Sequence, residues 1–158
     1  MPALRVYADT SVFGGVEDEE FAEFSQRFFA RVRRGDFVLL ISTQTLAELL
    51  AAPDRVKQVL RDLPTDVVES VAVDREVEAL ANAYLEAGVL PPSSRGDAVH
   101  VAAASVAAAD VVVSWNFRHI VRLDRIRKFN GVNALKGYRA LEIRSPMEVC
   151  YGPEAEEV

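Results

Sequence analysis

Four polar side chains, Asp9, Glu48, Asp97 and Asn116, border apolar segments and are the candidates for chemistry in this chain. Asp9 directly follows a short apolar run and Asn116 follows another, so both are expected at the ends of β-strands. Glu48 and Asp97 fall in segments that we predict to be helical. In open α/β sheets, ligands bind at the carboxyl ends of the strands. We therefore expect the four side chains to meet in one crevice.

Three carboxylates in one small site repel each other unless protons or cations neutralise them. Oxygen ligands without histidine or cysteine partners suit Mg²⁺ or Mn²⁺. Such an ion lowers the pKa of a bound water and orients that water toward a phosphate. The chain has no Walker A motif, and a phosphatase motif of the Asp-x-Asp type would need a second acid where Ser11 stands.

Each candidate also has an ordinary structural explanation. Asp9 could cap the turn that follows it. Residues 45–48 and 94–97 both have the spacing of a capping box, in which a side chain and a residue three positions later exchange hydrogen bonds with the backbone. The joint placement of the four residues at one sheet edge is what favours a functional site.

Neighbouring polar and aromatic residues leave two readings open. Thr10 and Ser11 could orient Asp9 or a metal-bound water, or could only hydrogen-bond the turn. His100 and His119 could contact phosphate or could be structural. Trp115 could stack on a nucleobase or fill the core at the end of its strand.

The elements that must position these residues alternate along the chain. Strands are expected at 4–9, 37–41, 67–73, 111–115 and 141–143, and helices from the acidic residues near 17 to 34 and at 42–52, 56–63, 74–88, 97–109 and 117–129, with a turn at Asn130-Gly131. Strands that alternate with helices predict a parallel sheet covered on both faces. With no repeat or linker, we expect one domain over residues 1–158.

The composition limits the class of protein. Half of the 158 residues are hydrophobic, which suits a globular domain with a real core. No apolar run approaches the length of about 20 residues that spans a membrane. Cys150 is the only cysteine, and the amino terminus has no signal-peptide pattern, so we expect a cytoplasmic protein without an intrachain disulfide.

The charge is uneven. A net charge of −6 argues against binding to nucleic acid by bulk charge alone. Residues 117–139, however, hold seven cations and a single anion, Asp124. Arg118 and Arg122 lead this segment and, with Ser11, are the predicted RNA contacts; the alternative is an ordinary solvated helix face.

These residues together resemble the PIN-domain nucleases. The resemblance rests on Asp9-Thr10-Ser11, on Glu48 within residues 45–49, on Asp97 within residues 97–104 and on Ser114-Trp115-Asn116, and it runs from about Val6 to the last expected strand. The length is similar to that of VapC-type toxins. The resemblance implies a three-layer α/β/α sandwich, an endoribonuclease that uses Mg²⁺ or Mn²⁺, a cognate antitoxin and a homodimer. The family's acidic ligands correspond to Asp9, Glu48 and Asp97.

One departure from the family stands out. Where the family commonly has a fourth Asp, this chain has Asn116, which offers one neutral oxygen in place of a charged pair. The second hypothesis is therefore a catalytically weak PIN-like domain that binds RNA or a protein. The Phe21, Phe24 and Phe28 stripe is expected to belong to the core, although Phe29 could widen it into a groove for a partner helix. The acidic residues 17–23 beside this Phe-rich helix are a candidate dimer or antitoxin surface.

Overall fold

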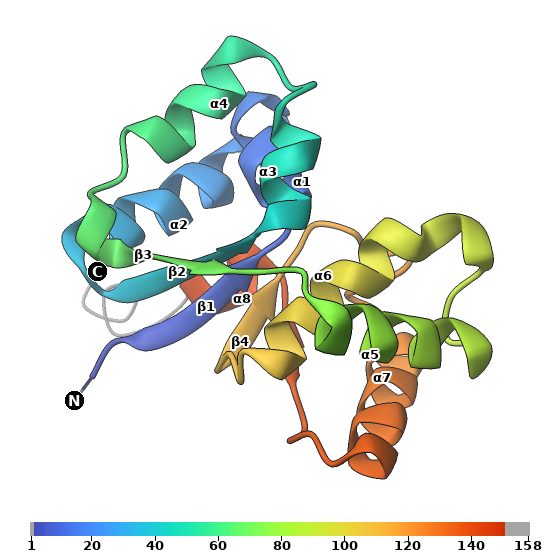
Figure 1. Cartoon of the computed structure of the whole chain (residues 1–158). Helices are drawn as coiled ribbons and strands as arrows, with labels where there is room; N and C mark the ends of the chain where they lie inside the picture. Colours follow the sequence, from blue (N-terminus) through green and yellow to red (C-terminus); the bar gives the residue numbers. More distant parts are fainter. Residues whose placement is uncertain (1, 151–158) are drawn as a thin grey trace.

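The computed structural model describes residues 2–150 and has a central β-sheet between layers of helices (Figure 1). The strands of this part of the chain are β1 (Leu4–Ala8), β2 (Phe37–Ser42), β3 (Val68–Val71), β4 (Val111–Val113) and β5 (Glu142–Arg144). They lie in the order β3-β2-β1-β4-β5, and each neighbouring pair is parallel. The predicted parallel sheet is confirmed, with β1 at its centre.

Helices account for most of the remaining described residues. The long ones are α2 (Ala22–Arg34), α4 (Asp54–Arg61), α5 (Arg75–Glu86), α6 (Arg95–Val106) and α7 (Leu123–Lys136), and the short ones are α1 (Thr10–Gly14), α3 (Thr43–Leu49) and α8 (Pro146–Cys150). None of the helices in the described residues is long and apolar enough to cross a membrane.

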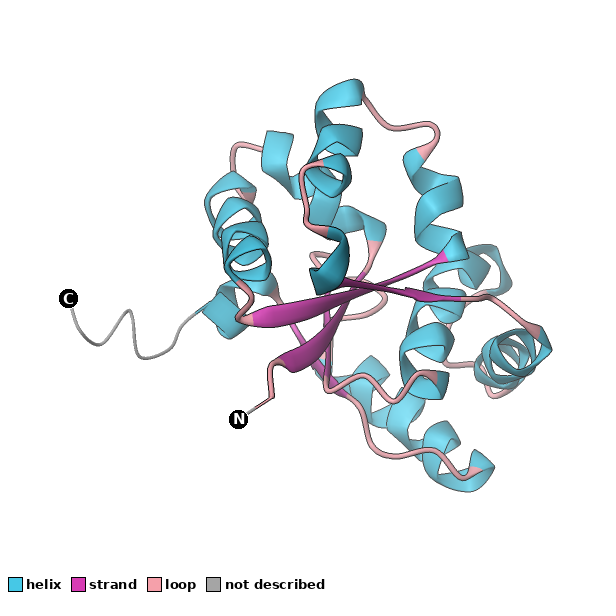
Figure 2. Ribbon diagram, turned by 60° about the vertical axis from the view of Figure 1, so that its left-hand side comes forward, coloured by secondary structure: helices cyan, strands magenta, loops and turns pink. Residues whose placement is uncertain are grey.

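The sheet divides the hydrophobic core into two parts. Successive side chains of a strand point to opposite faces, so Val6 and Ala8 of β1 join the cluster that contains Phe28 of α2, whereas Tyr7 joins the cluster that contains Tyr84 of α5. The two helical layers on opposite sides of the sheet are visible in Figures 1 and 2. The expected three-layer α/β/α sandwich is confirmed.

The prediction of a helix at 117–129 is wrong at both ends. The Oδ1 atom of Asn116 accepts a hydrogen bond from the His119 backbone N–H (2.9 Å), and this closes a tight turn. Arg122 is extended (φ −148°), so α7 begins only at Leu123. The helix then continues through Asn130, whose side-chain amide bonds both backbone groups of Leu141 (2.7 and 3.1 Å) and so ties α7 to the start of β5 instead of making a turn.

The segment after Asp9 also differs from the expectation. Residues 10–14 form the short helix α1, and residues 15–17 form a 3₁₀ turn, so α2 starts only at Ala22, and Glu23 is the one acidic residue of its first turn. Asp9 occupies the N-cap position of α1, yet its side chain makes no capping hydrogen bond. The carboxylate of Asp9 is therefore not engaged in capping α1.

Candidate active site

Asp9 lies at the carboxyl end of the central strand and is only 3% exposed. Ser11 Oγ donates to its Oδ1 (2.5 Å) and Ser114 Oγ, from the end of β4, donates to its Oδ2 (2.7 Å). Burial raises the pKa of Asp9 because it disfavours the charged form; His100 and the two serines oppose the rise, and the nearby negative charge of Asp97 adds to it. Asp9 is thus a buried carboxylate with two neutral hydroxyl donors.

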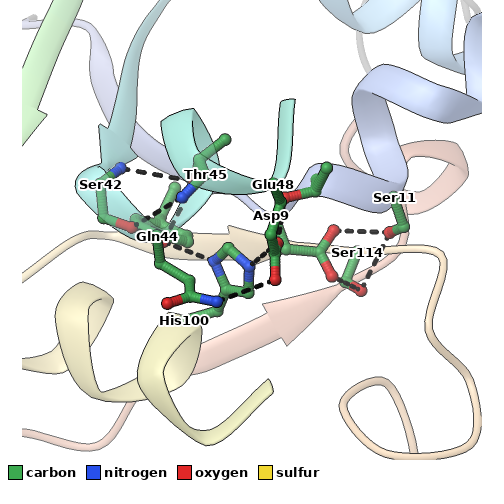
Figure 3. A network of polar contacts seen from close by, with 10 residues as sticks. Asp9, Ser11, Ser42, Gln44, Thr45, Glu48, His100 and Ser114 are labelled. Carbon is green, nitrogen blue, oxygen red and sulfur yellow. Dashed lines mark hydrogen bonds and ion pairs between the residues drawn. The ribbon is translucent and has the colours of Figure 1, made fainter. Parts of the chain in front are cut away.

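Glu48 is held in a different way, by groups from three helices (Figure 3). Thr10 Oγ1 of α1 donates to Oε1, His100 Nε2 of α6 lies 2.7 Å from the same oxygen, and Gln44 Nε2 of α3 donates to Oε2 (2.9 Å). Partial burial by itself would raise the pKa of Glu48. The hydrogen bond and charge interaction with His100, helped by Thr10 and Gln44, outweigh burial and lower this pKa to about 2.

His100 is the neighbour of Glu48 whose role the sequence left undecided. Its ring is buried, and its Nδ1 lies 2.7 Å from the Tyr7 hydroxyl, which in turn lies 2.7 Å from Ser42 Oγ. Because the ionised Glu48 can only accept, we assign a proton to Nε2 of His100, which donates to Glu48. The chain of hydrogen bonds from Ser42 through Tyr7 and His100 fixes the direction of Glu48.

The first turn of α6 packs closely on this corner at a glycine. A Cβ atom at Gly96 would stand 3.3 Å from both Gln44 Nε2 and Glu48 Oε2. Further along the helix, Ala98, Ala102 and the following small residues are fully buried, as expected for a helix that packs closely on the sheet. The expected capping boxes are wrong: the observed one pairs Ser42 with Thr45, and Ser94 makes no side-chain cap bond.

Asp97 lies in the first turn of α6, directly after Gly96. Its Oδ2 lies 3.0 Å from His119 Nδ1, and its side chain is 26% exposed. It lies near enough to Asp9 for its charge to raise the pKa of that residue. The structure therefore brings Asp9, Glu48 and Asp97 to the carboxyl edge of the sheet, as the sequence predicted.

Asn116 lies at the rim of the site. Its backbone N–H donates to Ser114 Oγ (2.9 Å), the same hydroxyl that bonds Asp9, while its side-chain Oδ1 is taken up by the turn to His119. The side chain of Asn116 is therefore linked to the site through its neighbours. Its predicted catalytic role stays a prediction.

The basic segment is less available than its sequence indicates. Arg122 forms two hydrogen bonds with Asp124 (2.5 and 2.6 Å), and Arg125 donates to the backbone oxygen of Val89. Arg118 is exposed and makes no ion pair within residues 2–150. Of the two predicted RNA contacts in this segment, Arg118 has the freer charge.

The donor set fits a hard divalent cation, although not as a closed cage. Within the described residues, no three Asp, Glu, His or Cys side chains are grouped tightly enough to surround a metal ion. Mg²⁺, however, commonly keeps several waters and is bound through one or two carboxylates. Asp9, buried beside a second carboxylate and without a Lys or Arg partner among the described residues, is an arrangement that a cation would stabilise.

Comparison with known proteins identifies the fold. No family model matches the sequence, and no curated protein matches it. Solved structures do match: a DNA-bound VapBC from Salmonella typhimurium, at 19% identity and a TM-score of 0.53, and VapBC2 from Rickettsia felis bound to a promoter DNA fragment, at 12% identity and 0.56. The chain has a PIN-like fold. Each match covers 90% of this chain and 98% of the other, so the PIN-like fold spans nearly the whole sequence.

Proposed function

We propose that this chain is a divalent-metal-dependent endoribonuclease and the VapC-type toxin of a toxin–antitoxin pair. The observation that carries the proposal is the pair Asp9 and Asp97 at the carboxyl end of the central strand, where one carboxylate is buried and is perturbed by the charge of the other. The similarity in fold to the VapBC structures supports the same function.

Asp9 and Asp97, with Glu48, would hold Mg²⁺ or Mn²⁺, which when bound supplies a water of lowered pKa beside the phosphate. Ser11 and Ser114 fix both oxygens of Asp9, and His100 and Thr10 fix Glu48. An effective general base has a pKa near the working pH. With a pKa of about 2, Glu48 stays ionised and contributes negative charge and orientation, not proton uptake.

The RNA backbone would approach from the side of Arg118, which follows Asn116 on the exposed turn. Arg122 would contribute less because Asp124 already neutralises it. The Ser11 hydroxyl, predicted to contact RNA, both donates to Asp9 and accepts from the Trp115 backbone N–H (2.9 Å). We therefore give Ser11 a positioning role.

An antitoxin protein is the proposed partner, and the VapBC neighbours support it. The homodimer is a further proposal. Phe28 is buried in the core, as expected for the stripe, and Phe29 is buried with it, so neither can form part of such a surface. Copurification with the product of an adjacent small gene, and light scattering of the isolated chain, test the two associations separately.

Cleavage of RNA by the purified protein tests the enzymatic proposal. With Mn²⁺ the protein should cut RNA, EDTA should stop the reaction, and Asp9→Asn and Asp97→Asn should each lower the rate by at least about a hundredfold. Asp66→Asn, an exposed acid remote from the site, is the matched control. Cleavage that survives Asp9→Asn at the wild-type rate would exclude this site as the source of the activity.

The alternative is a PIN-like domain that binds RNA or protein with little catalysis. Asn116 favours it, because the position lacks the charge of an Asp and its Oδ1 already serves the turn. RNA binding without cleavage in Mn²⁺, together with recovery of cleavage in Asn116→Asp, would support this alternative.

A further inference from the structure

A pocket of about 370 Å³ opens directly beside the carboxylates. It shares Ser11 and Asn116 with the site, and its other walls include Gly15, Asp18 and Phe21. Its volume lies within the range of about 300–1,000 Å³ that is usual for small-molecule sites. Because Ser11 also bonds Asp9, a group in this pocket would be one residue away from the proposed reaction centre.

One wall of the pocket is a fixed aromatic platform. The Trp115 ring stacks on Phe21, with centroids 4.3 Å apart and planes 16° apart. The Trp115 indole N–H donates to Ser25 Oγ (2.8 Å), and a Cβ at Gly15 would collide with both of these side chains, so the indole cannot shift. Phe117 packs 6.1 Å from Trp115 and 6.3 Å from Phe21, yet is 47% exposed. Phe117 is not one of the residues that line the pocket, but it packs against both aromatic lining residues and extends the platform to the exposed surface.

The charges around the pocket exclude a phosphate as its occupant. Asp18 is the one charged residue among those that line the pocket, and its charge is negative. Asp18 Oδ1 accepts from the Glu20 backbone N–H (2.8 Å), and Oδ2 has no hydrogen bond within the described residues. The pocket thus suits a flat, uncharged ligand that carries hydrogen-bond donors.

We propose that this pocket receives one base of the RNA strand, adjacent to the phosphate at the Asp9–Asp97 site, and that Asp18 makes guanine the preferred base. The inference rests on the proposed ribonuclease function and adds a specificity to it. Proteins commonly read unpaired RNA bases by stacking on aromatic rings and hydrogen bonding to the Watson–Crick edge.

The preference for guanine follows from the acceptor-only chemistry of Asp18. A carboxylate has two oxygens with about four lone-pair sites, so its bond to Glu20 leaves room for further donors. Guanine presents a ring N–H and an amino group side by side on its Watson–Crick edge. Adenine, cytosine and uracil each place at least one acceptor next to their donor, and that acceptor would face the carboxylate.

Trp115 makes the proposal measurable without catalysis, since it is the only tryptophan of the chain and its ring forms a pocket wall. The full chain in EDTA is titrated with GMP, AMP, CMP and UMP, which differ only in the base, and its intrinsic fluorescence is followed. We expect GMP to bind about tenfold more tightly than UMP. Asp18→Asn should reduce that preference to within about twofold.

Removal of the exposed ring tests the stacking. Stacking on an aromatic side chain corresponds to about five- to a hundredfold in affinity per base, so Phe117→Ala should weaken all four nucleotides by at least about fivefold. Leu135→Ala, which removes a side chain that is 86% exposed on α7, and Asp66→Asn are the matched controls and should bind like the wild type. Equal affinity for the four nucleotides in the wild type, or unchanged affinity in Phe117→Ala, would overturn the proposal.

The result can be separated from the fate of the proposed function. If nucleotide binding depends on Phe117 and Asp18 but the protein does not cut RNA with Mn²⁺, the base pocket is retained and the nuclease proposal is rejected. If the protein cuts RNA with Mn²⁺ but Phe117→Ala binds nucleotides as tightly as the wild type, the nuclease proposal is retained and the base pocket is rejected.

Discussion

The two sides of the crevice shift the pKa of a carboxylate in opposite directions. On the α3–α6 side, Glu48 has a histidine, a hydroxyl and an amide around it, and its pKa falls to about 2. On the β1–β4 side, burial raises the pKa of Asp9, and the charge of Asp97 adds to the rise, although two hydroxyl donors and the nearby His100 oppose it. The protein stabilises the charge of Glu48 fully and compensates that of Asp9 only in part.

The contrast indicates a division of roles. The hydrogen bonds from Ser42 through Tyr7 and His100 make the Glu48 side a satisfied buried network, which rigidifies the structure around it. The Asp9 side retains an electrostatic cost in the free protein, which a bound cation would relieve. Functional sites often carry such a cost in stability.

Removal of His100 should have the largest effect on stability. His100→Ala leaves Tyr7 and Glu48 without their shared partner and opens a cavity under α6, so we expect the free energy of unfolding to fall by about 2–4 kcal/mol. His119→Ala is the matched control, because His119 bonds Asp97 on the partly exposed side, and should lose about 1 kcal/mol or less. Urea denaturation measures both; equal losses would contradict the contrast.

The acid sensitivity of Glu48 should be the next largest effect. Its folded-state pKa lies below the ordinary value of 4.5, so the stability it contributes is present above pH 4.5 and is lost as the pH falls toward about 2. Since the side chain is 35% exposed, screening limits this contribution to about 1–2 kcal/mol. The gap in unfolding free energy between wild type and Glu48→Gln should shrink over that range; a gap independent of pH would reject the assignment.

Asp9→Asn should act in the opposite direction and by less. Because the folded-state pKa of Asp9 is raised, the ionised carboxylate destabilises the fold as the pH rises above the ordinary value of 3.8. Without metal at pH 7, Asp9→Asn should therefore raise the stability by about 0.5–2 kcal/mol, and the gain should vanish near pH 3. Thermal melts at the two pH values measure this, and a loss of stability at pH 7 would show that the charge is already compensated.

The fold and the acidic residues could be predicted because their signals are local. The apolar run of β2 and the alternation of strands with helices define a parallel sheet, and the ends of parallel strands necessarily share one edge, which places Asp9 beside the turn at Ser114 and Asn116. α1 has only five residues, too few for a helical period to be visible. The start of α7 depends on the turn that the hydrogen bond between Asn116 Oδ1 and the His119 backbone N–H closes, and no sequence pattern predicts this bond.

The parts of the site that were missed depend on contacts across the fold. In the sequence, His100 is only a polar residue within a predicted buried helix. The fold places Tyr7 beside it, and Ser42 beside Tyr7. The aromatic platform joins Phe21, at the start of α2, to Trp115 after β4, two segments far apart in sequence. The spacing of Asp97 and His100, three residues apart on one helix, was the single local signal that both serve the same site.

Titration of Mn²⁺ into the metal-free protein, followed by calorimetry, tests the central claim that the carboxylates of Asp9 and Asp97 form a cation site. The wild type should bind Mn²⁺ saturably at neutral pH, and Asp9→Asn and Asp97→Asn should each weaken binding by at least about tenfold because each removes one charge from the ion's surroundings. Asp66→Asn should bind like the wild type. Wild-type affinity in both site variants would contradict the account, whatever the protein does to RNA.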